Sequence, residues 1–128
     1  MNTLPVGLVG VGLMGHGIAL NIARRGYALT VLEHPGNQPL DELRALGVDT
    51  AESVQALVRR VKVLILCVTG SPQVEAVLLG EQGALVALRP GTVVIDCSTA
   101  IPASTESVAR AVVAAGGRFL DAPMTRTP

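Results

Sequence analysis

Val6-Gly-Leu-Val-Gly10-Val-Gly12-Leu-Met-Gly15, residues 6–15, is the stretch that decides the fold of this chain. It reads as a short apolar strand that runs into a G-x-G-x-x-G turn. An amphipathic helix is predicted to follow through Ala19-Leu-Asn21-Ile, and then a second strand that closes on Glu33. Glycine-rich turns are common, but this order of strand, turn, helix, strand and acid is far more specific. The sequence therefore predicts a βαβ unit at the start of the domain.

The three glycines of the turn have separate physical roles in such a unit. Gly10 allows the tight turn out of the strand, and Gly12 has no Cβ, so that a pyrophosphate can approach the backbone. Gly15 lets the helix pack closely, and the helix N-terminus then offers free N–H groups to phosphates. Glu33 follows Gly15 by 18 residues, close to the spacing at which an acid reaches a ribose hydroxyl. We therefore interpret residues 6–33 as a dinucleotide site.

The uncharged N-terminal region raises a rival interpretation. Residues 3–23 carry no formal charge, as in a membrane span or a signal peptide. A signal peptide begins with a positive region, which Met1-Asn2-Thr3 lacks. Glycines at positions 10, 12, 15 and 17, with His16 and Asn21, also make a poor hydrocarbon segment. We therefore expect no membrane association.

The charges of the chain are balanced and its cysteines are few. Ten basic residues match ten acidic ones, and no basic run exceeds two residues, so nucleic acid is not an expected partner. Cys67 and Cys97 lack metal-ligand spacing, and we expect neither a metal site nor a disulfide framework. Free cysteines near the ends of buried strands usually behave as small apolar residues. This cysteine usage fits a reduced, cytoplasmic setting.

The size and hydropathy of the chain suggest one domain with a missing neighbour. With 128 residues it can build a single core. Its aromatic content is only 2%, yet its mean hydropathy of +0.51 is high for a soluble domain of this size. Such a surplus of small aliphatic residues suggests apolar surface that faces another domain or subunit. We therefore expect residues 1–128, which include the dinucleotide site, to be one domain and a fragment of a larger protein.

Beyond Glu33, apolar strands alternate with helical segments. Strands are predicted at 48–50, 61–68, 92–96 and 118–121, and helices at 40–46, 51–60, 72–79, 83–88 and 102–115. Ser71 is placed to cap the helix that begins at Pro72. This alternation predicts a Rossmann fold, a doubly wound α/β domain with a mainly parallel sheet of about six strands.

Ligands bind such sheets at the carboxyl ends of the strands. The residues that directly follow the predicted strands are therefore the candidates for the site. They are residues 11–14, Glu33 and His34, Val68 and Thr69, Ser98 and Thr99, and residues 123–126.

Three short segments, spread over almost the whole chain, carry a family resemblance. The first is Gly10-x-Gly12-x-Met14-Gly15 with Asn21 and Gly26 following; the second is Asp96-Cys-Ser98-Thr99-Ala-Ile-Pro102; the third is Asp121-Ala122-Pro123. In this order they resemble the N-terminal signature, the Asp-x-Ser-Thr-x-x-Pro motif and the start of the Asp-Ala-Pro-Val-Ser-Gly-Gly substrate loop of the β-hydroxyacid dehydrogenases. That family includes 3-hydroxyisobutyrate dehydrogenase, tartronate semialdehyde reductase and, more distantly, 6-phosphogluconate dehydrogenase.

The resemblance implies a nicotinamide-dependent oxidoreductase that transfers a hydride between its cofactor and a short 3-hydroxyacid or the corresponding aldehyde. By position, Leu13 and Met14 would offer backbone N–H groups to the cofactor pyrophosphate. Val68 and Thr69 would line the path of the cofactor. These positions add to the glycine turn as expected cofactor contacts.

The resemblance also assigns residues to the two ends of the site. Val74 would flank the adenine, Thr99 would lie near the nicotinamide ribose, and Ser98 would belong to the substrate side together with Thr125. Arg126 departs from the family, because it replaces a glycine of the substrate loop. Since Arg pairs bidentately with carboxylates, we hypothesise a substrate with an additional acidic group. An Arg126 that faces solvent or a further domain is the alternative.

Glu33 and His34 bear on the choice between NAD and NADP. A carboxylate at position 33 accepts hydrogen bonds from the ribose 2′-OH and repels a 2′-phosphate, which favours NAD. The family members that prefer NADP tend to carry Asn-Arg at these positions. A protonated His34 would partly offset the negative charge, so NADP stays possible. A Glu33 that is simply a solvated strand end is the alternative.

The chain offers no convincing general base. The resemblance implies a catalytic lysine on a helix after the substrate loop, beyond residue 128. The single lysine, Lys62, is predicted at the amino edge of the sheet, opposite the cofactor, and His16 is predicted on the helix surface near the phosphates. We therefore expect a chain that binds NAD without turnover. A helical second domain, which usually forms the dimer in this family, would complete the enzyme.

Two other functions compete with this interpretation. A dinucleotide-binding or interaction module without catalysis would use the same fold, because fold does not fix function. An imine reductase would also share the motifs, since such enzymes resemble this family but lack the lysine.

Overall fold

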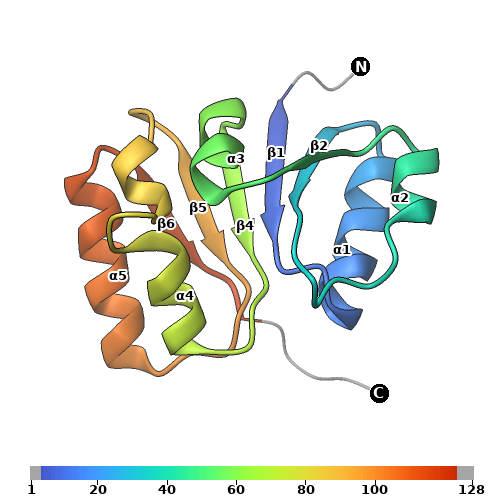
Figure 1. The fold of residues 1–128 in the computed structure, drawn as a ribbon. Coiled ribbons are helices and arrows are strands. Elements are labelled where there is room, and N and C mark those ends of the chain that lie inside the picture. The colour runs from blue at the N-terminus through green and yellow to red at the C-terminus, as the bar shows by residue number, and fades with distance from the viewer. Residues whose placement is uncertain (1–3, 124–128) are drawn as a thin grey trace.

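A six-stranded sheet with helices on both faces forms the domain (Figure 1). In the computed structural model, which describes residues 4–123, the strands follow the order β3-β2-β1-β4-β5-β6. The strands are β1 (Pro5–Val9), β2 (Ala28–Leu32), β3 (Asp49–Ala51), β4 (Val63–Leu66), β5 (Val93–Asp96) and β6 (Arg118–Asp121). Each printed pairing between neighbours is parallel. The doubly wound parallel sheet of about six strands that the sequence predicts is confirmed, and the structure adds the order of the strands.

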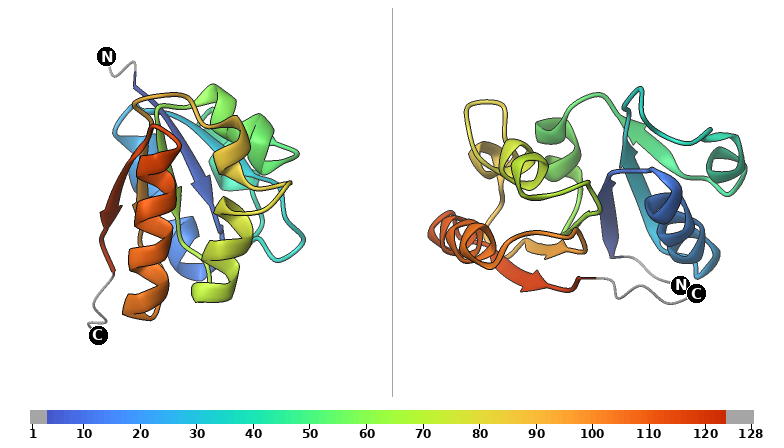
Figure 2. Two further views of the ribbon diagram at one scale, coloured as in Figure 1. Left: turned by 90° about the vertical axis from the view of Figure 1, so that its left-hand side faces the viewer. Right: turned by 90° about the horizontal axis from the view of Figure 1, so that it is seen from below.

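The helices cover the two faces of the sheet in two groups. They are α1 (Leu13–Arg24), α2 (Asp41–Ala45), α3 (Val54–Arg60), α4 (Ser71–Leu78), the short 3-10 helix η1 (Ala84–Ala87) and α5 (Pro102–Ala114). Helices α1 and α2 pack on one face, and the other helices pack on the opposite face (Figures 1 and 2). Because strand side chains alternate, the neighbours Leu8 and Val9 enter different cores, on the α1 face and on the α3 face respectively.

Three predicted boundaries moved by two or three residues, each for a physical reason. The helix predicted at 51–60 starts at Val54, because Ala51 pairs with Leu32 in the sheet and Ser53 caps the helix with its hydroxyl, which accepts the Ala56 N–H at 3.1 Å. The strand predicted at 61–68 is shorter, since Val61 follows α3 as its C-cap residue. At the other end, the Val68 N–H donates to a serine hydroxyl instead of a strand carbonyl.

The prediction that Ser71 caps α4 was wrong. Gly70 occupies the N-cap position, and Ser71 is the first residue of the helix. The Ser71 hydroxyl instead accepts the backbone N–H of Ile101, 2.9 Å away, in the loop after β5. The serine therefore joins two loops rather than closing its own helix.

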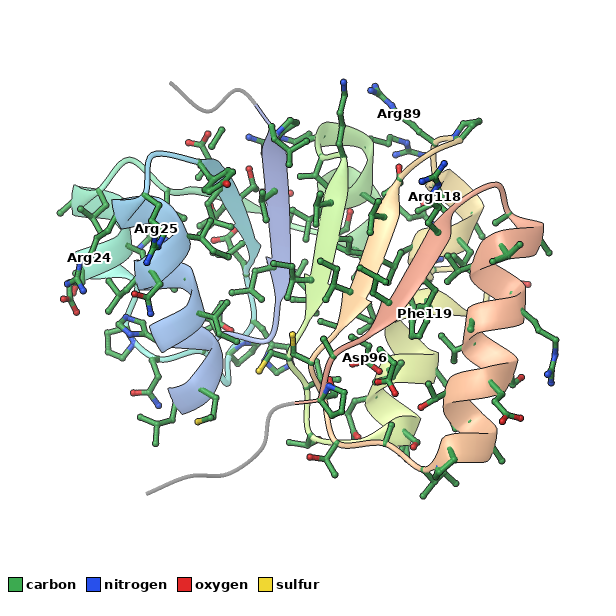
Figure 3. The ribbon with its side chains drawn as sticks, turned by 180° about the vertical axis from the view of Figure 1, so that it is seen from behind. Arg24, Arg25, Arg89, Asp96, Arg118 and Phe119 are labelled. Carbon is green, nitrogen blue, oxygen red and sulfur yellow. The ribbon has the colours of Figure 1, made fainter. Side chains whose placement is uncertain are left out.

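Part of the sheet is open on the α1 side. No helix within residues 4–123 lies over β5 and β6 on this face (Figure 3). Ile65, Ile95 and Leu120 form one row across the strands by register, and Leu120 is 56% exposed. The apolar surplus of the composition is thus partly found on this open face.

Candidate functional site

The glycine turn after β1 has the geometry that its sequence predicts. Gly10 has φ +99°, a conformation that favours glycine, and a Cβ there would overlap the carbonyl of Cys67. A Cβ on Gly15 would overlap the carbonyl oxygen of Gly10, so only glycine lets α1 start this close to the turn. A Cβ on Gly12 would meet nothing within 4 Å. The space beside Gly12 is therefore open for a ligand to approach the backbone.

The start of α1 is suited to bind an anion. Gly12 is its N-cap residue and supplies no side-chain cap, and the first turn holds no acidic residue. The first N–H groups of a helix have no partner inside the helix and lie at the positive end of its dipole. The backbone N–H groups of Leu13 and Met14 belong to this turn, and their side chains are 80% and 56% exposed. The arrangement fits a pyrophosphate group at this point.

A cavity of about 440 Å³ opens at the carboxyl ends of β1 and β4. These two strands are neighbours in the sheet, and the chain continues in opposite directions from them, which makes this the topological switch point (Figure 2, right). The cavity is lined by Val9, Gly10, Val11, Gly12, Leu32, His34, Gly36, Asn37, Cys67, Val68, Thr69, Gln73, Ala76 and Val77. The structure thus brings together the glycine turn, His34 and the Val68-Thr69 pair.

A second hollow, of about 490 Å³, lies beside the first at the end of β2. Glu33 and Glu52 line it, whereas His34 and Asn37 line both hollows. The intervening loop is held against the glycine turn, because the Gln38 N–H donates to the Val11 carbonyl at 2.7 Å. Glu33 is exposed at the position where the sequence predicts a ribose contact, next to the main cavity rather than within its lining.

A local hydrogen bond fixes the His34 ring. The Gly36 N–H donates to His34 Nδ1 at 2.9 Å, so this nitrogen acts as an acceptor. Nδ1 is therefore engaged within the loop, and Nε2 is the ring nitrogen left to contact a ligand.

Ser98 lies inside the protein rather than on the substrate side of the site. Its side chain is 3% exposed, and its hydroxyl accepts the Val68 N–H at 2.8 Å. Its own N–H donates to Asp96 Oδ1, also at 2.8 Å, and Asp96 is fully buried at the carboxyl end of β5 (Figure 3). The other Asp96 carboxylate oxygen, Oδ2, has no hydrogen-bond partner among the described residues. Thr99, in contrast, is exposed beside Gly70.

The prediction that Val74 flanks the adenine is corrected by its burial. Val74 is 1% exposed and belongs to the core beneath α4. Gln73, Ala76 and Val77 face the cavity instead. Positions 73, 76 and 77 share one face of a helix, whereas 74 and 78 share another, so helical periodicity was the signal that could have found them. Thr125 and Arg126 lie outside the described residues.

Both cysteines are half-buried free thiols at the ends of neighbouring strands. Burial raises the pKa of the Cys67 thiol, and the negative charge of the Asp96 carboxylate raises this pKa further. Burial also raises the pKa of the Cys97 thiol, with smaller contributions from Cys67 and then Asp96. Cys67 lines the cavity, but a thiol with a raised pKa is a poor nucleophile at neutral pH.

Lys62, the one lysine of the chain, lies at the edge of the sheet opposite the cavity. Lys62 is exposed just before β4, where its N–H donates to the Pro5 carbonyl at the amino edge of the sheet. The Arg89 and Arg118 side chains lie at the same edge, opposite Asp96 (Figure 3). Within residues 4–123, no three His, Cys, Asp or Glu side chains are grouped to hold a metal ion. No described helix is long and apolar enough to cross a membrane.

Comparison with known proteins places this arrangement in a family. Residues 5–127 match the model described as the NAD binding domain of 6-phosphogluconate dehydrogenase. The chain is 35% identical to 2-hydroxy-3-oxopropionate reductase of Escherichia coli K12, over 95% of this chain and 41% of that protein. It is 31% identical to the cytokine-like nuclear factor N-PAC of Xenopus tropicalis, over 94% of this chain and 22% of that protein. The chain thus spans about two fifths of the reductase.

Solved structures agree with the sequence comparison. A 3-hydroxyisobutyrate dehydrogenase from Salmonella typhimurium matches with a TM-score of 0.86 and 31% identity, over 97% of this chain and 43% of that one. A variant imine reductase from Myxococcus stipitatus, in complex with NAD+, matches with a TM-score of 0.81 over 94% of this chain and 40% of that one. At 22% identity the second likeness shows the fold alone. The family match and the glycine turn together identify the chain as an N-terminal NAD-binding domain of the β-hydroxyacid dehydrogenase family.

Proposed function

We propose that this chain is the cofactor-binding half of an oxidoreductase that acts on a short 3-hydroxyacid or the corresponding aldehyde. The cavity at the switch point carries this proposal, because it joins the open backbone at Gly12 to the uncapped start of α1. Two relatives whose names specify a 3-hydroxyacid or an oxo acid, the reductase and the 3-hydroxyisobutyrate dehydrogenase, support the substrate class. When bound, the nicotinamide cofactor supplies the hydride chemistry.

The residues of the chain would divide the binding between backbone and side chains. The N–H groups of Leu13 and Met14 would hold the pyrophosphate, next to Gly12. Val68 and Thr69 would line the path toward the nicotinamide, with Thr99 beyond them at the end of β5. The substrate contacts proposed for Thr125 and Arg126, including pairing of Arg126 with an additional substrate carboxylate, stay predictions from the sequence.

We also propose NAD rather than NADP as the preferred cofactor. Glu33 and Glu52 both line the hollow at the end of β2, where the adenosine ribose of a bound dinucleotide would lie. A 2′-phosphate would face these two carboxylates. Like charges repel, so the phosphate would weaken binding.

The proton donor of the reaction would come from outside these residues. Lys62 lies at the amino edge of the sheet, and a base must be within hydrogen-bond reach of the proton that it moves. The open face with Leu120 and the exposed Leu13, Met14 and Ile101 offer apolar surface on which a helical second domain would pack. Residues 1–128 would therefore be one domain of a homo-oligomeric enzyme in a reducing, cytoplasmic setting, which the two free thiols support.

Titration of the chain with NAD+ and NADP+ by calorimetry tests the cofactor proposal. We expect NAD+ to bind more tightly than NADP+. If neither dinucleotide binds, the cofactor proposal is wrong. Assay of the chain with short hydroxyacids and NAD+ should show no turnover. Robust oxidation would disprove the proposal that the proton donor lies outside these residues. The likeness to N-PAC, whose name is not that of an enzyme, keeps a non-catalytic module as the second candidate.

Activity of the longer polypeptide that contains this chain distinguishes the remaining functions. Reduction of cyclic imines without oxidation of hydroxyacids would favour an imine reductase. Dinucleotide binding without either activity would favour the module.

A further inference from the structure

Three serine hydroxyls connect the loop and helix after β4 to the loop and helix after β5. The Ser98 hydroxyl accepts the Val68 N–H at 2.8 Å, and the Ser71 hydroxyl accepts the Ile101 N–H at 2.9 Å. The Ser104 hydroxyl donates to Glu75 Oε2 at 2.5 Å. We name Ser71, Ser98 and Ser104 the serine bridge. Two of its members come from the β5 side and one from the β4 side, so the two segments hold each other.

The serine bridge lies mostly inside the protein, where its bonds have few substitutes. Ser98 is 3% and Ser104 is 8% exposed. The backbone of Ser98 is fixed in turn, because its N–H donates to the fully buried Asp96. The Ser98 hydroxyl is the acceptor of this part-buried N–H, so its removal would take away the protein partner of the Val68 N–H. The position of Val68 therefore depends on the Ser98 side chain.

The serine bridge acts on one end of the cavity only. Val68 and Thr69 line the cavity at the end of β4, whereas His34 and Glu33 lie at the end of β2, on the other side of β1. In a dinucleotide fold the acid after the second strand marks the adenosine end. The segment that the serine bridge holds thus belongs to the opposite, nicotinamide end.

We propose that Ser98 and Ser71 are positioning residues, which hold the Val68-Thr69 segment in the shape that receives the nicotinamide ring of the cofactor. This proposal rests on the proposed function, because it assumes that the cavity binds a nicotinamide dinucleotide. Ser98 is buried and acts through the Val68 backbone, whose N–H its hydroxyl accepts. Ser71 acts in the same way through the Ile101 backbone, next to the exposed Thr99.

The test compares NADH with ADP-ribose, which contains the adenosine end of the cofactor but no nicotinamide. In calorimetric titrations of the 128-residue chain, Ser98→Ala should raise the Kd for NADH by about threefold to tenfold, the effect of one neutral hydrogen bond, and leave the Kd for ADP-ribose unchanged. Ser71→Ala, at a partly exposed position, should act in the same direction. Ser98→Thr, which restores a hydroxyl, should recover part of the loss.

Ser107→Ala is the control. It removes a serine hydroxyl at an exposed position of α5 and should change neither affinity. Equal weakening of NADH and ADP-ribose by Ser98→Ala and Ser71→Ala would show a merely structural role and overturn the proposal. Unchanged affinities, or a wild-type chain that binds NADH no better than ADP-ribose, would overturn it as well. A wild-type chain that binds neither would instead overturn the proposed function.

Discussion

Gly12→Ala should separate cofactor binding from folding. Gly12 has φ −75°, which alanine adopts freely, and a Cβ at this position meets no protein atom within 4 Å. The added methyl group would instead occupy the space between the start of α1 and the cavity. We therefore expect a folded variant whose backbone no longer admits a phosphate.

The size of the effect follows from the hydrogen bonds at stake. A hydrogen bond to a charged group contributes about 1.5–3 kcal/mol, so loss of one from the pyrophosphate raises the Kd about 10- to 150-fold. Alanine is a somewhat poorer N-cap residue than glycine, and the free energy of unfolding should fall by no more than about 1 kcal/mol. The expected loss is thus larger in binding than in stability.

Two neighbouring glycines provide the controls. Gly17→Ala adds a methyl group to α1 that meets nothing within 4 Å, and alanine in a helix should stabilise the chain by about 0.5–1 kcal/mol. Gly15→Ala would force its Cβ onto the Gly10 carbonyl and should destabilise the fold by about 3 kcal/mol or more. NADH fluorescence titration gives the Kd and urea unfolding gives the stability. Wild-type affinity in Gly12→Ala would refute the assignment of the pyrophosphate to this turn.

Three further substitutions or measurements test the site and the core. Glu33→Gln should narrow the preference for NAD+ over NADP+ by about threefold to tenfold, since one negative charge is removed, and an unchanged ratio in calorimetry would contradict this. Because burial and then Asp96 raise the pKa of the Cys67 thiol, iodoacetamide should label it slowly at neutral pH and faster as the pH rises past 9.0. Asp96→Asn should speed the labelling at fixed pH, and equal rates in the folded and urea-unfolded chains would count against the raised pKa. Leu57→Ala, at a fully buried side chain beside Gly7, should cost about 2–5 kcal/mol in urea unfolding, whereas a loss below about 1 kcal/mol would show that the cavity collapses.

The fold was predictable because local and long-range signals agree in this chain. The apolar strand before Gly10 and the continuous apolar run before Cys67 both indicate strands covered on two faces, and the structure pairs β1 with β4. Short connections and right-handed crossovers then leave few possible strand orders. Boundaries were less certain, because they depend on single bonds such as the Ser53 cap. Other residues of the sequence could form such a cap equally well, so the sequence alone does not fix the boundary.

The sequence predicted the location of the site better than the direction of its side chains. The rule about carboxyl ends finds the correct edge of the sheet but does not say which residue turns inward. Ser98 turns into the protein, toward Val68, and its neighbour Thr99 is exposed. Val74 turns into the core, although it lies on the helix that borders the cavity. Helical periodicity separates the two faces of α4, whereas the direction of Ser98 goes with its hydrogen bond to the Val68 N–H.

The candidate cofactor site is built mainly from backbone, so many of its side chains can change without loss of its shape. The turn at Gly10 and the first N–H groups of α1 depend on chain path rather than on side-chain chemistry. A relative at 31% identity therefore keeps the same fold with a TM-score of 0.86. Side chains matter where they hold that path, as Ser98 does, or where they meet a variable part of the cofactor, as Glu33 would. Substitutions that alter dinucleotide binding without unfolding the chain should accordingly be concentrated at Gly12, Glu33 and the serine bridge.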